Sequence, residues 1–420
     1  MADLVEKVGN YISKQVLTRP DYARKLLVGA FEAYGWKLRH LPNPKLSHSK
    51  QYLSAISSKF MTRPLFHPDQ QILTSIFTPC EIFHAMNLYP MCAEQFAAYT
   101  NGAHSEHVFI KAAEDAGIAE TFCSYHKVVI GAAISGVLPK PKAIVNTSLT
   151  CDANNLTFRK VAEIFDVPRY YIDVPWHTDE EAIRYVADQL REMARFVEDI
   201  TGRSLQDELL RERISCSDRT IRHLRSCIPL RKNHFVPSEM TAELYEILMA
   251  HNALGTDEAL RYAGMLHREL SNAPDVPGRK ILWMHPNPFY QSSVKALFNY
   301  RTDPRISLSE MCCDGLIPSR RDDPYEIMAE RCVLNTFNGP ASRRAEAACA
   351  LAKESGADGV ILFCHWGCKE TCGASTLIAD TLEEAGFPVL VVNGDGVDRL
   401  NAPDGQIITR ISAFMEMLER

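Results

Sequence analysis

Short apolar segments with the length of β-strands alternate with helical patterns in two separate parts of the chain. Most of these segments end at a proline, glycine or polar residue, and the stretches between them carry apolar residues at helical spacing. Strands that alternate with helices in this way form parallel sheets with crossover helices. The expected strands lie at residues 72–77, 143–147 and 170–174 in the first part, and at 280–284, 305–308, 359–363 and 388–392 in the second.

The same pattern divides the chain into four regions. Residues 1–60 are predicted to form an N-terminal helical segment, and residues 61–177 a first α/β domain. Residues 178–275 are charged and helical without a strand pattern, and strands and helices alternate again over residues 276–420. The sequence therefore predicts an α/β fold in which a helical connector joins two doubly wound parallel-sheet domains.

Charge and composition exclude several classes of function. The 46 basic and 52 acidic residues give a formal net charge of −6, and no basic run marks a nucleic-acid site. The first residues are charged where a signal peptide needs an apolar stretch. The longest mostly apolar run, at residues 128–138, is too short to span a bilayer. We therefore expect a cytoplasmic protein that binds neither nucleic acid nor membranes.

Thirteen cysteines are unusual for such a chain, because cytosolic thiols stay reduced and form no disulfide framework. Four of them lie in helical patterns and are expected to have no role in a site: Cys216, Cys227, Cys332 and Cys349. Most of the others lie in loops after predicted strands or before a helix: Cys80, Cys123, Cys151, Cys312, Cys313, Cys364, Cys368 and Cys372. Such loops form the ligand-binding edge of a parallel sheet, so these positions indicate a function.

Thiolates at this edge suit iron–sulfur chemistry better than the alternatives. No Cys-x-x-Cys pair marks a redox dithiol, and only Cys364, Cys368 and Cys372 with His365 offer a local group of candidate zinc ligands. A cubane cluster accepts ligands from distant loops, because its separate irons each bind one ligand. Spacing alone therefore ranks an iron–sulfur cluster ahead of zinc. The sequence has no phosphate-binding loop or dinucleotide motif, so ATP would be used by another protein.

Five motifs, in order over residues 70–420, carry a resemblance to a known superfamily. They are Pro79-Cys80-Glu81-Ile82-Phe83 continuing to Glu94-Gln95, Phe122-Cys123-Ser124-Tyr125, Thr150-Cys151-Asp152, Asp358-Gly359-Val360 with Gly367-Cys368-Lys369, and Gly386-Phe387-Pro388-Val389-Leu390 with Asp395. Each motif alone is weak, but all five in this order are specific. Together they resemble the 2-hydroxyacyl-CoA dehydratase and benzoyl-CoA reductase superfamily.

The resemblance implies a [4Fe-4S] cluster held by Cys123, Cys151 and Cys368 at the cleft between the two domains, with one iron left open. In the dehydratases of this superfamily, the open iron binds an oxygen of the acyl-CoA substrate, and a ketyl radical forms and expels the hydroxyl group. A separate ATP-dependent activator protein supplies the electron. The resemblance also implies a second similar subunit or a homodimer.

Other residues near these motifs have candidate roles. Glu94 resembles the family's carboxylate that exchanges a proton with the departing hydroxyl, although a solvated glutamate on a helix surface fits the local sequence nearly as well. His365 and Lys369 flank Cys368 and either tune the cluster or face solvent. Asp152 is expected to cap the helix that begins there.

The surplus cysteines leave two alternatives open. The surplus cysteines resemble the enlarged ligand set of a superfamily branch with a double-cubane [8Fe-9S] cluster, whose members reduce small molecules with ATP-driven electrons: Cys80, Cys312, Cys313, Cys364 and Cys372. Cys312 is the best match to the extra ligand, and its thiol is expected to point into the cleft with Cys368. Cys80, in contrast, lies away from the expected position. The second alternative is a non-enzymatic metal or redox-storage protein.

Overall fold

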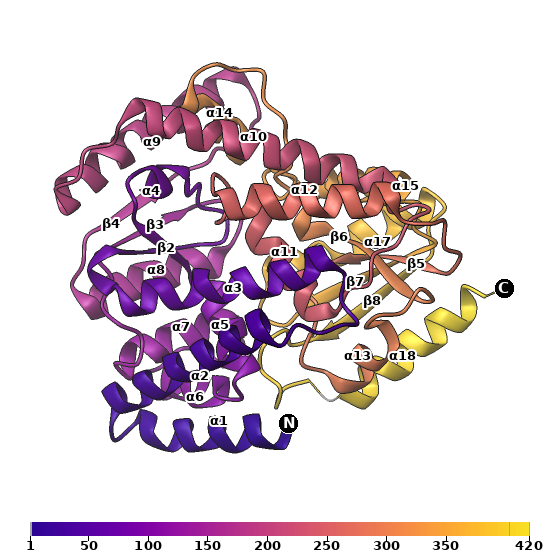
Figure 1. The fold of residues 1–420 in the computed structure, drawn as a ribbon, viewed down its shortest axis with the longest axis horizontal. Helices are drawn as coiled ribbons and strands as arrows, with labels where there is room; N and C mark the ends of the chain where they lie inside the picture. The colour runs from indigo at the N-terminus through magenta and orange to yellow at the C-terminus, as the bar shows by residue number, and fades with distance from the viewer. Residues whose placement is uncertain (1, 403, 420) are drawn as a thin grey trace.

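The computed structural model describes residues 2–402 and 404–419 of the protein, which form two lobes (Figure 1). Each lobe contains a four-stranded parallel sheet, with strand order β2-β1-β3-β4 in the first lobe and β6-β5-β7-β8 in the second. The predicted α/β fold with two parallel sheets is therefore confirmed. The strands are β1 (Gln71–Thr74), β2 (Tyr89–Cys92), β3 (Ala143–Thr147), β4 (Arg169–Ile172), β5 (Lys280–Met284), β6 (Arg305–Ser309), β7 (Gly359–His365) and β8 (Val389–Gly394).

Helices cover both faces of each sheet, because successive strand residues point to opposite sides. In β1, Ile72 and Leu73 belong to two different buried clusters, and Ile361 and Leu362 of β7 do the same. The helices that follow or precede the strands are α4 (Glu81–Ala85), α5 (Ala93–Gly102), α6 (Glu106–Asp115), α7 (Ser124–Ile134), α8 (Asp152–Phe165), α13 (Ser292–Phe298), α14 (Pro324–Val333), α15 (Ala341–Ser355), α16 (Lys369–Cys372), α17 (Ser375–Glu384) and α18 (Asp404–Met417), with the 3₁₀ turns η1 (Pro68–Gln70) and η2 (Glu310–Cys312).

The sequence analysis did not predict β2, the edge strand of the first sheet. Pro90 lies within β2 and pairs in register with Ile72 of β1. Proline has no N–H to donate, so a sequence that contains it is a poor candidate for a central strand. An edge strand tolerates proline, since only one of its sides needs hydrogen bonds. The tertiary position of this segment therefore outweighs its local sequence.

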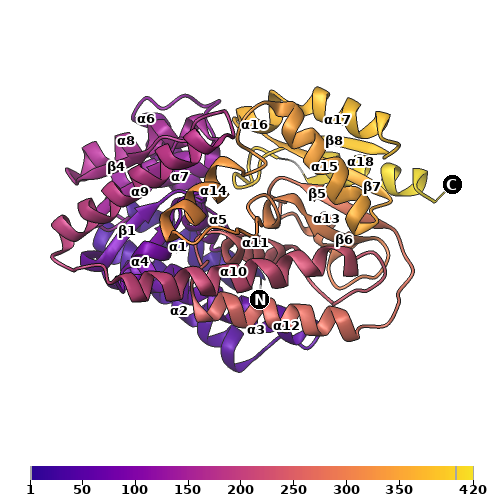
Figure 2. The same cartoon turned by 90° about the horizontal axis from the view of Figure 1, so that it is seen from above.

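Long helices connect the two lobes. Figures 1 and 2 show α10 and α12 side by side across both lobes, and α10 packs against α4 of the first lobe and α15 of the second. The predicted boundaries at residues 60, 177 and 275 stay predictions. Among the described residues, no helix combines the length and the apolar character that a membrane span requires. The remaining helices are α1 (Ala2–Val16), α2 (Pro20–His40), α3 (His48–Phe66), α9 (Glu180–Thr201), α10 (Asp207–Leu230), α11 (Met240–Ala250) and α12 (Asp257–Asn272).

Helix α14 follows β6 in the chain but packs on the first lobe. It lies against α9 and α10, and its residues Met328 and Val333 are buried in the same cluster as Ile72 of β1. Arg331 of α14 also forms a buried ion pair with Glu81 at the start of α4. The apolar face of α14 is buried only because the chain crosses between the lobes twice, which the sequence pattern did not indicate.

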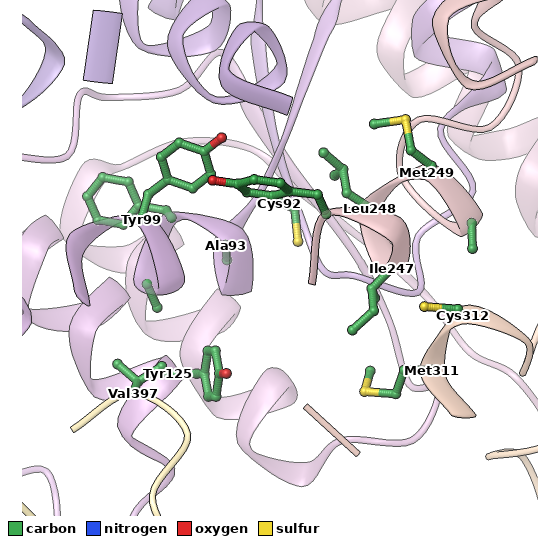
Figure 3. Close-up of a cluster of buried hydrophobic side chains, with 14 of the residues drawn as sticks. Cys92, Ala93, Tyr99, Tyr125, Ile247, Leu248, Met249, Met311, Cys312 and Val397 are labelled. Atoms are coloured by element: carbon green, nitrogen blue, oxygen red, sulfur yellow. The ribbon is translucent and has the colours of Figure 1, made fainter. Parts of the chain in front are cut away.

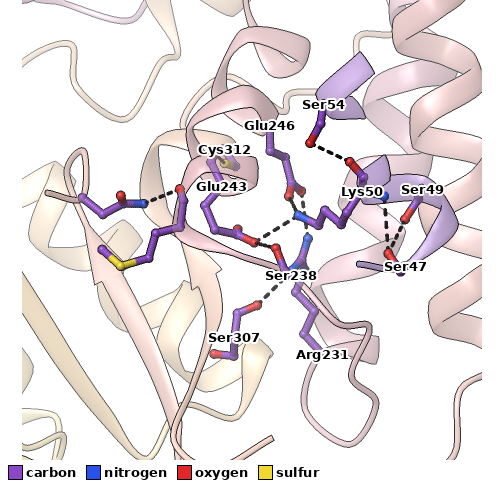
Figure 4. Close-up of polar contacts among 12 residues, drawn as sticks. Ser47, Ser49, Lys50, Ser54, Arg231, Ser238, Glu243, Glu246, Ser307 and Cys312 are labelled. Carbon is purple, nitrogen blue, oxygen red and sulfur yellow. Dashed lines mark hydrogen bonds and ion pairs between the residues drawn. The ribbon is translucent and has the colours of Figure 1, made fainter. Parts of the chain in front are cut away.

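A buried cluster of four charges joins α3, α10 and α11 (Figure 4). The ammonium of Lys50 lies 3.1 Å from a carboxylate oxygen of Glu243 and also pairs with Glu246. The guanidinium of Arg231 pairs with Glu246 at 2.8 Å and donates to the carbonyl of Ser307 in β6 at 3.1 Å. Two positive and two negative charges therefore balance in a place with almost no exposure to water.

Candidate active site between the two lobes

A cavity of about 740 Å³ is lined by both lobes. Its walls are mostly apolar, and Figure 3 shows Tyr99, Tyr125, Ile247 and Met311 around it, from α5, α7, α11 and η2. Cavities of this size with apolar walls and a few polar groups are typical ligand sites. This cavity is therefore the candidate active site.

Cys123, Cys151 and Cys368 all line this cavity. Cys151 follows β3 and Cys368 follows β7, so both lie at the carboxyl edge of their sheets, where parallel sheets bind ligands. Cys123 and Cys151 are the N-cap residues of α7 and α8, whose helix dipoles favour negative charge on the sulfur. The structure thus brings together the three cysteines that the resemblance singled out.

Two backbone positions beside these cysteines have unusual conformations. Gly367 has a φ of +80°, and a Cβ at this position would lie 2.7 Å from the backbone nitrogen of Cys123. Only glycine allows this approach, which places Cys368 beside Cys123. Thr150, directly before Cys151, has a φ of +112°, a strained conformation for a β-branched residue. Backbone strain of this kind is concentrated at functional sites.

The three thiols fit a site that holds positively charged metal. Burial raises the pKa of Cys123, and the nearby Cys151 and Cys368 raise it further. Burial and then Cys368 raise the pKa of Cys151 in the same way. Such thiols lose their protons when a bound cation compensates the charge. The residues described include no group of three or more His, Cys, Asp or Glu arranged for a metal ion, whereas a cubane binds its ligands through separate irons.

Two buried histidines face the sulfur atoms. His365 Nε2 lies 3.2 Å from Cys123 Sγ, and His126 Nε2 lies 3.6 Å from Cys151 Sγ. Burial lowers the pKa of His365. Burial, and then the nearby His365, lower the pKa of His126 to about 3. Sequence analysis left the place of His365 open and did not single out His126, because only the fold brings each ring to its cysteine.

Two carboxylates also line the cavity. Glu94 lies in the first turn of α5, accepts a hydrogen bond from the Cys92 thiol at 3.3 Å, and has its pKa raised by burial. The structure therefore does not place Glu94 on a solvated helix surface. Glu370, which the sequence analysis did not single out, lies two residues after Cys368, and burial raises its pKa as well. Either group can hold a proton near neutral pH more readily than an exposed carboxylate.

The other candidate ligands, Cys80, Cys312 and Cys372, do not line the cavity. The buried thiol of Cys312 faces the carbonyl of Glu243 at 3.7 Å, and its neighbour Met311 lines the cavity instead. This differs from the expectation that Cys312 points into the cleft with Cys368. The physical reason is the 3₁₀ turn η2, because the chain turns at Glu310–Cys312 instead of continuing the direction of β6. Cys80 is fully buried and donates to the carbonyl of Thr78, and Cys372 is exposed.

The expected capping role of Asp152 is corrected by the structure. Cys151 is the N-cap of α8, and its sulfur accepts from the backbone nitrogen of Asn154 at 3.4 Å. Asp152 instead forms an ion pair with Lys369 at 2.9 Å, and both side chains are exposed. The pair joins the two loops at the surface. Of the two residues that flank Cys368, Lys369 therefore faces solvent and His365 faces the site.

Comparison with known proteins shows a family match over most of the chain. The family described as 2-hydroxyglutaryl-CoA dehydratase, D-component, matches residues 75–418. The chain is 22% identical to the (R)-phenyllactyl-CoA dehydratase alpha subunit of Clostridium sporogenes over 369 residues, which cover 81% of this chain and 87% of that protein. It is also 22% identical to the lactoyl-CoA dehydratase subunit alpha of Anaerotignum propionicum over 386 residues, which cover 81% and 89%.

A third relative, the (R)-2-hydroxyglutaryl-CoA dehydratase subunit alpha of Acidaminococcus fermentans, is 21% identical over 307 residues, which cover 67% of this chain and 61% of that protein. The region matched by the family, residues 75–418, contains every strand except β1 and all three cysteines of the cavity. Sequence, fold and relatives therefore agree, and the chain belongs to the 2-hydroxyglutaryl-CoA dehydratase D-component family.

Proposed function

We propose that this protein is the iron–sulfur component of a 2-hydroxyacyl-CoA dehydratase, with a [4Fe-4S] cluster held by Cys123, Cys151 and Cys368. The observation that carries the proposal is that these thiols, from three loops and both lobes, line one cavity together with Glu94. The dehydratase names of the relatives support the same reaction class. When bound, the cluster would supply a low-potential electron and a Lewis-acidic iron to the substrate.

The cavity walls support an acyl-CoA rather than a small molecule as the substrate. Most of the surface is aromatic or aliphatic, as with Phe31, Tyr99, Ile247 and Phe337. A volume of about 740 Å³ exceeds what a diatomic or similarly small substrate needs. The apolar walls would hold an acyl chain and exclude water from the reacting carbon.

Glu94 is the residue we propose for proton transfer. Its carboxyl lines the cavity, and burial raises its pKa, so a proton can reside there near neutral pH. In this form Glu94 would donate to the departing hydroxyl oxygen, and it would recover a proton from the substrate as the carboxylate. The hydrogen bond from Cys92 fixes the carboxyl at the start of α5.

The proposal also includes partners and a location. The relatives are called alpha subunits, which supports a second subunit beside this chain, or a second copy of it. The sequence contains no nucleotide-binding motif, which supports a separate ATP-dependent activator that delivers the electron. A cytoplasmic location would keep the many free thiols reduced.

The positions of the surplus cysteines support the single cluster over the double-cubane alternative. Cys312 and Cys80 are buried away from the cavity lining, and Cys372 is exposed outside it. Extra ligands to a larger cluster would have to reach the same space as Cys368. A redox-storage role, the third alternative, gives no reason for a large apolar cavity beside the thiols.

Metal and sulfide analysis of anaerobically purified protein tests this proposal. We expect about four irons and about four sulfides per chain, and loss of most iron in Cys123→Ser, Cys151→Ser and Cys368→Ser. Cys216→Ser is the matched control, because this buried thiol of α10 donates to the carbonyl of Thr256 away from the cavity. Full iron in all three serine variants would contradict the ligand set. About eight irons would favour the double cluster, and zinc without sulfide the storage role.

A further inference from the structure

We propose that His365 is a positioning residue that donates an N–H···S hydrogen bond to the Cys123 sulfur and thereby raises the reduction potential of the cluster. The inference rests on the proposed function, because it concerns the ligand sulfur of that cluster. His365 would then determine in part how readily the cluster accepts an electron.

The position of His365 aims its ring at the sulfur. His365 is the last residue of β7, in the second lobe, and its side chain is only 2% exposed. Nε2 lies 3.2 Å from Sγ of Cys123, which belongs to the first lobe. Tyr125 packs edge-on against the ring at 5.3 Å, and His285 stacks on it at 6.4 Å. Packing on both sides leaves the ring little freedom to turn away.

Hydrogen bonds fix which ring nitrogen carries the proton. The backbone N–H of Gly396 donates to Nδ1 of His365 at 3.0 Å, so Nδ1 is an acceptor. Because Nδ1 carries no proton, the N–H of the ring is on Nε2, the nitrogen that faces the sulfur. The nearby carboxylate of Asp395 does not compete for this proton, since its Oδ1 already accepts from Ser124 Oγ and from the backbone nitrogens of Val397 and Asp398.

His126 provides an instructive comparison. Its Nε2 lies 3.6 Å from Cys151 Sγ, but its Nδ1 is buried and has no hydrogen-bond partner among the described residues. No second bond fixes its proton on Nε2. Of these two histidines, His365 is therefore the one whose Nε2 is fixed as the donor by a hydrogen bond to its other ring nitrogen.

A donor on a ligand sulfur changes the electron affinity of a cluster. Reduction adds negative charge to the cluster and its thiolates, and a hydrogen bond to the sulfur stabilises this added charge. Charge-assisted hydrogen bonds change an equilibrium by about tenfold or more. We therefore expect loss of the His365 donor to make reduction about tenfold less favourable, which for a one-electron couple is a fall of about 59 mV.

Two matched variants separate the donor from the bulk of the ring. His365→Asn keeps an oxygen near the position of Nδ1, able to accept from Gly396, but has no group at the position of Nε2. His365→Gln extends an amide N–H to about the position of Nε2. His267→Phe, on α12 next to His223, is the remote control. Each full-length protein is purified anaerobically, its iron and sulfide are counted, and its midpoint potential is measured by a redox titration followed by electron paramagnetic resonance.

We expect the potential of His365→Asn to fall by about 59 mV, and those of His365→Gln and His267→Phe to stay near the wild type. Loss of iron in His365→Asn with full iron in His365→Gln would also support a hydrogen bond from position 365 to the Cys123 sulfur, because that bond would then hold the cysteine in place to bind iron. Equal potentials in wild type and His365→Asn, or equal falls in Asn and Gln variants, would overturn the inference. Wild-type protein without an iron–sulfur cluster would instead refute the proposed function, which is a distinguishable result.

Discussion

Replacement of Lys50 by methionine is expected to destabilise the protein strongly without touching the cavity. The Lys50 side chain is fully buried, and its ammonium lies between the carboxylates of Glu243 and Glu246. Methionine has nearly the same length but no charge. In the variant, Glu246 would still form an ion pair with Arg231, whereas Glu243 would retain only the hydrogen bond from the hydroxyl of Ser238. The variant thus leaves one buried carboxylate without a counter-charge.

The expected cost is about 3–5 kcal/mol, the usual loss when one partner of a buried ion pair is removed. Lys50 and Arg231 together also stabilise the charge on Glu246, so part of this second contribution depends on Lys50. Burial alone would raise the pKa of Glu246, but Lys50 and Arg231 lower it from 4.5 to about 2, so the folded state stabilises the charged form. This difference corresponds to about 3 kcal/mol. Since the folded pKa lies below the unfolded one, this stabilisation is present above pH 4.5 and is lost as the pH falls towards 2.

Urea unfolding of the wild type and of Lys50→Met, at neutral and at acidic pH, measures both effects. The variant should unfold at a much lower urea concentration than the wild type at neutral pH. Between pH 4.5 and 2, the free energy of unfolding should change less in the variant than in the wild type. Adding Glu243→Gln to Lys50→Met restores the balance of one positive and one negative charge, so the double variant should recover part of the loss. Lys111→Met, at an exposed ion pair, is the control and should change little. A Lys50→Met midpoint like that of the wild type, or no recovery in the double variant, would refute the reasoning.

Three further predictions concern the proposed cluster site. Gly367→Ala should lower the iron content, because its Cβ would meet the backbone of Cys123, while Gly386→Ala, also at positive φ but with open space around it, should keep full iron; equal iron in the two variants would count against the close approach. Glu94→Gln should keep its iron but slow dehydration of a 2-hydroxyacyl-CoA by about 100-fold or more in an assay with the activator, and an unchanged rate would exclude Glu94 as the proton donor. Cys312→Ser should keep full iron by metal analysis and unfold at slightly lower urea, whereas a large loss of iron would favour the double cluster.

The sheets could be predicted from sequence because their central strands are short, continuous apolar segments between turn residues. Ile361 and Leu362 show why, since both faces of β7 are buried and no alternation with polar residues is needed. Strand β2 could not be predicted because it contains Pro90. The packing of α14 on the first lobe could not be predicted either, because the local spacing of its apolar residues does not depend on which lobe it contacts. Which lobe a helix packs against depends on contacts between distant residues, and a single sequence does not record these.

Topology explains how the sequence could predict which cysteines lie together. The ends of parallel strands placed Cys151 and Cys368 at the carboxyl edges of their two sheets, and the family motif added Cys123. The sequence does not predict the direction of a side chain within a turn. In the 3₁₀ turn η2, Met311 lines the cavity and the thiol of Cys312 is buried away from the cavity. His126 was missed for a related reason, because a buried histidine becomes informative only when its partner is known.

The geometry of the cysteine site depends on contact between the two lobes. Three consecutive residues of the first lobe bind the second: Cys123 through His365, Ser124 through Asp395 at 2.6 Å, and Tyr125 through the carbonyl of Gly396 at 3.5 Å. Gly367 approaches the same segment from the second lobe. Any rotation of one lobe against the other would break these bonds and move Cys368 away from Cys123 and Cys151. The thiols can therefore act as one ligand set only while the lobes are closed, so binding of the proposed cluster and lobe closure would stabilise each other.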